Sequence, residues 1–68
     1  MDYWGEIGGA SGVLYTSLTS EEGPATISKA KKKTQLDDEL LLMAIGWLAR
    51  EDKIEIVKNK RGLKISLK

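Results

Sequence analysis

The stretch LDDELLLMAIGWLAREDKIEI, residues 36–56, contains the change of periodicity that decides the fold. Between residues 36 and 52 the apolar side chains recur at helical spacing, and one inner stripe consists of Leu41, Ala44, Ile45 and Leu48. From Ile54 onward the period changes to two, which is typical of a strand with one buried face. The stretch therefore predicts a helix that is followed directly by a β-strand.

The alternation continues through the last residues of the chain. Ile54 and Ile56 alternate with charged residues, and the apolar positions of 63–67 alternate with Lys64 and Ser66. The intervening segment 58–62 (KNKRG) is rich in turn-forming residues. A two-stranded hairpin with one buried and one solvated face is predicted.

Two further helices are predicted upstream. Residues 1–5 form a terminal arm, and residues 6–18 support a first helix that begins properly only near Ser11, because glycines weaken its start. After a loop at 19–24, Thr26 is the expected N-cap of a second helix that ends near Thr34.

Angular spacing divides the second helix into two faces. Ile27, Ala30, Lys31 and Thr34 fall on the inner side, whereas Lys29, Lys32 and Lys33 face solvent. The third helix starts at Asp37 or Asp38, where a carboxylate accepts from free backbone N–H groups.

Composition limits the kind of protein this is. A chain of 68 residues has room for one small domain, here residues 6–68, and it contains no Cys, His or Phe. Disulfides, thiolate or imidazole metal sites and histidine general bases are excluded, so no cofactor, metal or catalytic residue is expected. The short apolar runs predict neither a signal peptide nor a membrane span, and a cytoplasmic location is expected.

Three helices followed by a basic-tipped hairpin resemble a winged helix-turn-helix domain. Residues 44–54 resemble the end of the third helix and the entry to the wing, where Leu48 precedes Ile54 by six residues. Residues 11–18 resemble the first helix of such domains. Together these segments resemble a family of very small bacterial winged-helix proteins of unassigned function.

The resemblance implies DNA binding or, as in a minority of winged helices, a contact with protein. The chain departs from the family pattern at Ala30 and Lys31, where an apolar pair is usual, and at Gln35, where Gly is common. Both departures predict a loosely packed second helix.

The third helix lacks the chemistry of a reading helix. Its outer face carries Glu39, Leu42, Met43, Gly46 and Arg50, whereas base edges and phosphates call for several donors. An apolar outer strip usually marks an interface, and Trp47 at its edge is a candidate anchor. The partner is a second copy, making a homodimer, or another protein; alternatively the arm, the first helix or the wing covers the strip within one chain.

The basic clusters are the best indication of nucleic acid. Winged helices contact phosphates at positions held here by Lys29, Lys32, Lys33, Lys58, Lys60 and Arg61. Such contacts supply affinity without sequence information. The alternative is a solvated charged face that keeps a small protein soluble.

Three other features point to simpler roles. Tyr3 and Trp4 form an aromatic arm that stacks on bases or, more in keeping with terminal arms, folds onto the body or a dimer mate. The glycine string at 5–12 lacks the spacing of a phosphate loop. The acids at 37–39 diverge around a helix and serve as caps, so no enzyme is expected.

Two functions remain from the sequence. The first is a non-enzymatic, homodimeric regulatory module that binds DNA without sequence specificity through the lysines of the second helix and the wing. The second is a protein-interaction module without nucleic-acid binding. No small-molecule substrate and no membrane partner are indicated.

Overall fold

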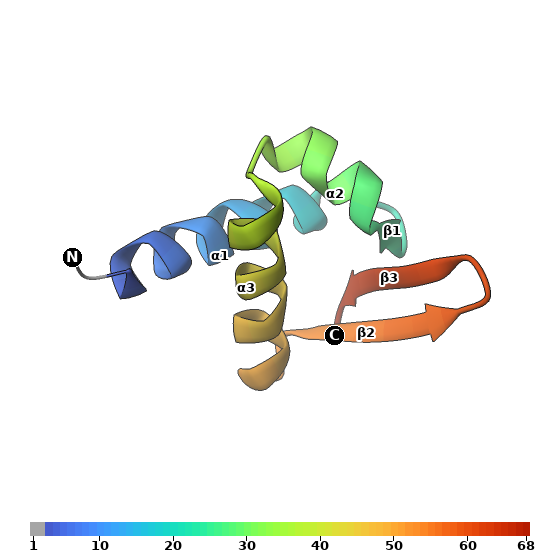
Figure 1. Ribbon diagram of the computed structural model, residues 1–68. Coiled ribbons are helices and arrows are strands. Elements are labelled where there is room, and N and C mark those ends of the chain that lie inside the picture. The colour runs from blue at the N-terminus through green and yellow to red at the C-terminus, as the bar shows by residue number, and fades with distance from the viewer. Residues whose placement is uncertain (1–2) are drawn as a thin grey trace.

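The fold is a crossed set of three helices with a small sheet at one side. The structure, a computed structural model, describes residues 3–68 (Figure 1). The elements, in chain order, are α1 (Trp4–Thr19), β1 (Ala25–Thr26), α2 (Ile27–Thr34), α3 (Asp38–Arg50), β2 (Ile54–Asn59) and β3 (Gly62–Leu67). α1 and α3 cross, and the hairpin of β2 and β3 extends away from them (Figure 1). The predicted order of three helices and a wing is confirmed.

α1 is longer than predicted. It begins at Trp4, so residues 4 and 5 belong to the helix and the predicted arm 1–5 is wrong for them; Met1 and Asp2 lie outside the described residues. The expected start near Ser11 is also wrong. Ala10, Leu14 and Leu18 are buried along one side of α1, and this packing outweighs the low helix propensity of the glycines.

Side-chain caps fix the starts of α2 and α3. Thr26 accepts from the backbone N–H of Lys29 at 3.1 Å, as predicted, and Asp37 accepts from the N–H of Leu40 at 2.8 Å. Of the two candidate caps, Asp37 is therefore the one used. Gln35 closes α2 in a left-handed conformation with φ of 59°, which explains why Gly suits this position.

The sheet has three strands rather than the two predicted. All neighbours are antiparallel in the order β1-β3-β2, with Ala25 opposite Ile65 and Thr26 opposite Lys64. β1 has only two residues, too few to show a period. In the turn of the hairpin, the Asn59 side chain accepts from the Arg61 N–H at 2.9 Å. The next residue, Gly62, has φ of 122°, a conformation that favours glycine.

The core joins α1, α3 and the base of the sheet. Leu14, Leu41 and Ile65 are its largest fully buried side chains. The predicted α3 stripe is confirmed, because all four of its members are buried: Leu41, Ala44, Ile45 and Leu48.

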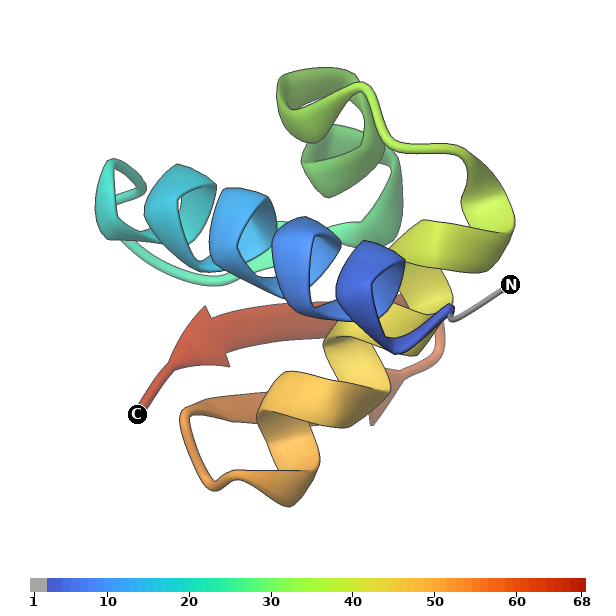
Figure 2. The ribbon, with the colours of Figure 1, turned by 90° about the vertical axis from the view of Figure 1, so that its left-hand side faces the viewer.

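The hairpin buries less than predicted. Ile54 is buried, but Ile56 is 42% exposed, so the expectation of a continuous buried face is wrong along β2. Figure 2 shows α2 on one side of α1 and the hairpin on the other. The helices therefore cover only the base of the wing, and its outer half is exposed to solvent.

Candidate nucleic-acid interface

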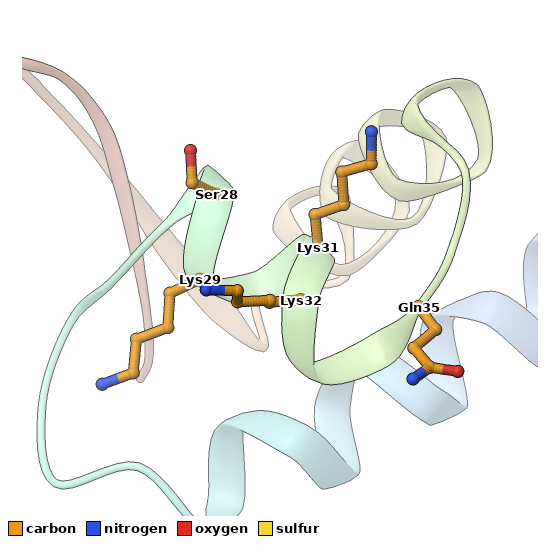
Figure 3. Close-up of a pocket in the computed structure, with 5 residues that line it drawn as sticks. All are labelled: Ser28, Lys29, Lys31, Lys32 and Gln35. Carbon is orange, nitrogen blue, oxygen red and sulfur yellow. The ribbon is translucent and has the colours of Figure 1, made fainter.

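α2 presents a polar outer face. Ala30 is buried and Ile27 and Thr34 are half-buried, as predicted for the inner side. The prediction for Lys31 is wrong: Lys31 is exposed, and its ammonium pairs with Asp38 at 2.6 Å. This ion pair joins the outer face of α2 to the first turn of α3. An open concavity on this face is lined by Ser28, Lys29, Lys31, Lys32 and Gln35 (Figure 3).

One carboxylate binds two of the predicted phosphate-contacting lysines. Glu21, whose side chain is only 8% exposed, pairs with Lys29 at 2.9 Å and also with Lys33. Lys33 donates in addition to the Ser20 hydroxyl at 3.1 Å. Hydrogen bonds from Lys33 and then Lys29 hold the pKa of Glu21 below its usual value. This arrangement fastens α2 to the end of α1 and partly neutralises both lysines.

The remaining predicted cations are exposed and unpaired. Lys32 on α2 and Lys58, Lys60 and Arg61 on the wing make no ion pair with any residue in 3–68. Lys60 and Arg61 form the two-residue turn that joins β2 to β3, and Lys58 lies two residues before it in β2. The wing tip is therefore the strongest basic surface in the described part of the chain.

A groove of about 320 Å³ connects the wing with the start of α2. Arg61 and Lys64 line it from the wing, and Thr26 and Ser28 line it from the opposite side. Lys64 and Ser28 were not predicted as site residues. The sequence shows Lys64 as one of the polar residues that alternate with apolar ones in β3. Only the pairing of β1 with β3 places Lys64 opposite Thr26.

The outer face of α3 is apolar and exposed, as predicted. Leu42 is 54% exposed and Met43 is 36% exposed. A Cβ added at Gly46 would meet no atom within 4 Å, so packing within the chain does not require a glycine there. These three residues, named here the α3 strip, remain uncovered by the described residues.

The aromatic residues at the start of the chain lie against α3. The ring centroids of Trp4 and Trp47 are 5.6 Å apart, and the ring planes are tilted by 54°. Of the alternatives for the arm, Trp4 therefore packs on the body of its own chain and covers part of Trp47, which is half-buried. Tyr3 and Trp4 keep 40% and 66% of their surface exposed, so both add to the exposed aromatic surface at the start of α1.

The described residues offer little for other kinds of site. No helix within 3–68 is long and apolar enough to cross a membrane. In the same range, no group of three or more acidic, histidine or cysteine side chains is placed to hold a metal ion. The acids at the start of α3 do not act as one group, because Asp37 caps the helix and Asp38 pairs with Lys31.

Comparison with known proteins agrees with this architecture. Residues 1–67 match the winged helix-turn-helix domain family DUF2582, and the chain belongs to that family, which has no assigned function. It is 41% identical over 68 residues to an uncharacterized protein, MJ1608, of the archaeon Methanocaldococcus jannaschii, covering 98% of this chain and 97% of the relative. The predicted family is thus confirmed, while the archaeal relative shows that similar chains are not restricted to bacteria.

A solved structure gives the same fold. The solution NMR structure of protein BT2368 from Bacteroides thetaiotaomicron superposes with a TM-score of 0.81 at 29% identity. The match covers 100% of this chain and 80% of the other. The fold is therefore a winged helix-turn-helix with three helices and a three-stranded sheet whose wing is the β2–β3 hairpin.

Replacing Glu21 tests its role in holding α2. Since the pKa of Glu21 is lowered in the folded protein, its carboxylate stabilises the fold above the unfolded pKa, and the contribution is lost as pH falls through the folded pKa. Glu21→Gln should therefore lower the Tm near pH 7, and the difference from wild type should shrink as the pH falls through the lowered pKa of Glu21. Thermal unfolding followed by circular dichroism at a series of pH values measures this.

Glu22→Gln is the matched control, because Glu22 is exposed and makes no ion pair within residues 3–68. It should leave the Tm near that of wild type at every pH. A Glu21→Gln effect independent of pH, or equal to that of the control, would contradict the assigned role.

Proposed function

We propose that this winged helix-turn-helix protein is a non-catalytic binding protein that holds duplex DNA by its phosphates through the wing and α2. The proposal rests chiefly on one observation: the exposed cations at the wing tip have no acidic partner within residues 3–68. The groove lined by Arg61 and Lys64 joins this surface to the start of α2. Of the predicted phosphate-contacting residues, the exposed cations without an ion pair in this range are Lys32, Lys58, Lys60 and Arg61. Lys64, which is half-buried, lines the same groove as Arg61.

Local charge matters more here than net charge. The formal net charge is only +1, but the acids nearest to α2 are already engaged, Glu21 by two lysines and Asp38 by Lys31. The wing cations are therefore left to attract an anionic partner. Phosphate contacts of this kind release counterions, which makes binding steeply dependent on salt.

A second copy of the chain is the proposed partner of the α3 strip. Leu42 and Met43 are large apolar side chains left in solvent on the helix that lies at the centre of the fold. Gly46 lies on the same strip and would let another backbone approach closely. A small domain gains buried apolar area by association, and a two-fold dimer would present the wing surfaces twice.

The same apolar surface favours a second candidate function, a protein-interaction module without nucleic-acid binding. In that case the α3 strip binds a different protein and the wing lysines only keep the chain soluble. The two candidates differ in their predicted affinity for DNA at low salt.

A salt titration of binding to a random-sequence duplex separates them. The DNA proposal predicts that log Kd rises linearly with log salt concentration, with a slope of about 0.9 for each phosphate contact. The charge reversals Lys32→Glu, Lys58→Glu, Lys60→Glu and Arg61→Glu, combined in one variant, should reduce that slope by about 4 and weaken binding at least a hundredfold.

The matched control reverses two cations outside the proposed surface, Lys53 and Lys68, which pair with Glu51 and Asp52. It should retain most of the salt slope. Absence of binding by the wild type at about 50 mM salt would overturn the DNA proposal and leave the protein-interaction function.

Leu42→Glu tests the dimer. A carboxylate at this position would be buried against the second copy without a partner, so the variant should be monomeric by multi-angle light scattering. Val57→Glu, at a wing position that is 49% exposed, is the control and should leave the dimer intact. An unchanged mass for Leu42→Glu would remove the α3 strip from the interface.

A further inference from the structure

The outer face of α2 carries hydrogen-bonding side chains and no acid. Ser28, Lys31 and Lys32 are spaced i, i+3 and i+4, so they lie on one face of α2, and Gln35 follows as the left-handed residue that closes the helix. These four residues are named here the α2 stripe. Figure 3 shows Ser28 and Gln35 at the two ends of this set, with the lysines between them and the Gln35 side chain pointing in a different direction from that of Ser28. Ser28 and Gln35 are exposed, as are both lysines between them. The stripe thus offers neutral donors and acceptors at both ends, and between them Lys31, which is paired with Asp38, and Lys32, which has no ion pair within residues 3–68.

We propose that α2, rather than α3, enters the major groove of duplex DNA and contacts base edges through Ser28 and Gln35. This inference rests on the proposed DNA binding and adds to it the residues that would give a base preference. A glutamine side chain can bind adenine N6 and N7 together, and serine can donate to or accept from several base edges.

The dimensions of α2 suit this placement. An α-helix with its side chains is about 10–12 Å across, which fits a major groove about 12 Å wide, and the eight residues of α2 are about 12 Å long. Ser28 and Gln35 are separated by about 10 Å along the helix axis, or roughly three base-pair steps of 3.4 Å. Two turns of helix therefore span a short run of base pairs without a longer recognition helix.

The wing groove continues the α2 stripe. Ser28 lines both the concavity on α2 and the groove that contains Arg61 and Lys64. A duplex that receives α2 in its groove therefore lies beside the wing cations, which can hold its phosphates. Lys32 supplies charge to base or phosphate contacts alike, so the neutral residues are the ones that distinguish base recognition from phosphate binding.

The α3 face offers no comparable set of contacts. Its exposed side chains are the carboxylate of Glu39 and the apolar Leu42 and Met43, with one cation, Arg50, at the far end. A carboxylate in that position repels phosphates. By contrast, the acid nearest to the α2 stripe, Asp38, is already paired with Lys31 at 2.6 Å.

Selection from a duplex library with randomised base pairs tests the inference. Wild-type protein should select a preference over three to four adjacent pairs, with about five- to a hundredfold discrimination at each contacted pair. Ser28→Ala and Gln35→Gly should each abolish discrimination at one pair. Glycine suits the left-handed backbone of residue 35, so that variant removes the side chain without straining the fold.

Since both changes are neutral, the salt slope should stay that of wild type, and Thr16→Ala, an exposed change on α1, should retain the full preference. Salt-dependent binding without base preference would overturn the inference while leaving phosphate binding intact. A base preference that survives both α2 variants but is lost in Met43→Ala would also overturn the inference. Equal competition by duplex RNA would overturn it too, because the A-form major groove is too narrow for a helix. No binding at about 50 mM salt would instead refute the proposed function itself.

Discussion

Burial of the inner stripe of α3 against α1 is the interaction on which the rest of the structure depends. Leu14 of α1 and Leu41 of α3 are both fully buried, and Ile65 of the central strand completes the core. A chain of 68 residues can build only one such cluster. α2 contributes little more than Ala30 to it, so polar contacts hold α2 in place: the Thr26 cap and the two ion pairs of Glu21.

This distribution of apolar residues separates two surfaces. α3 has more apolar side chains than its inner face can bury, and the excess forms the α3 strip. α2 has few apolar side chains, and its outer face is polar and basic. The wing carries its cations at the tip and also exposes Ile56 and Val57 on β2. The helix that usually recognises DNA in a winged helix is thus suited to protein, and the surface suited to nucleic acid lies beside it. Because the two surfaces are distinct, the proposed dimerisation and the proposed DNA binding are compatible in one small chain.

Periodicity and local chemistry sufficed to predict most of the fold. The α3 stripe, the Thr26 cap and the hairpin follow from residues close together in the sequence. The start of α1 could not be predicted in this way, because the burial of Ala10 and Leu14 in the tertiary structure outweighs the low helix propensity of the glycines. β1 exists only through pairing with β3, which lies about forty residues further along the chain. Long-range contacts likewise decide the site: the pairing of Glu21 with Lys29 and Lys33, and of Trp4 with Trp47, leaves no periodic signal.

The proposed arrangement has nucleic acid in contact with α2 and the wing, while α3 faces protein. Titration of isotope-labelled protein with a short DNA duplex, followed through the backbone amide signals by NMR, distinguishes the two surfaces. The largest shift changes should fall on residues 28–35 and 58–64, and the amides of Leu42 and Met43 should stay nearly unmoved. Large changes along the outer face of α3, with the wing amides unmoved, would contradict it.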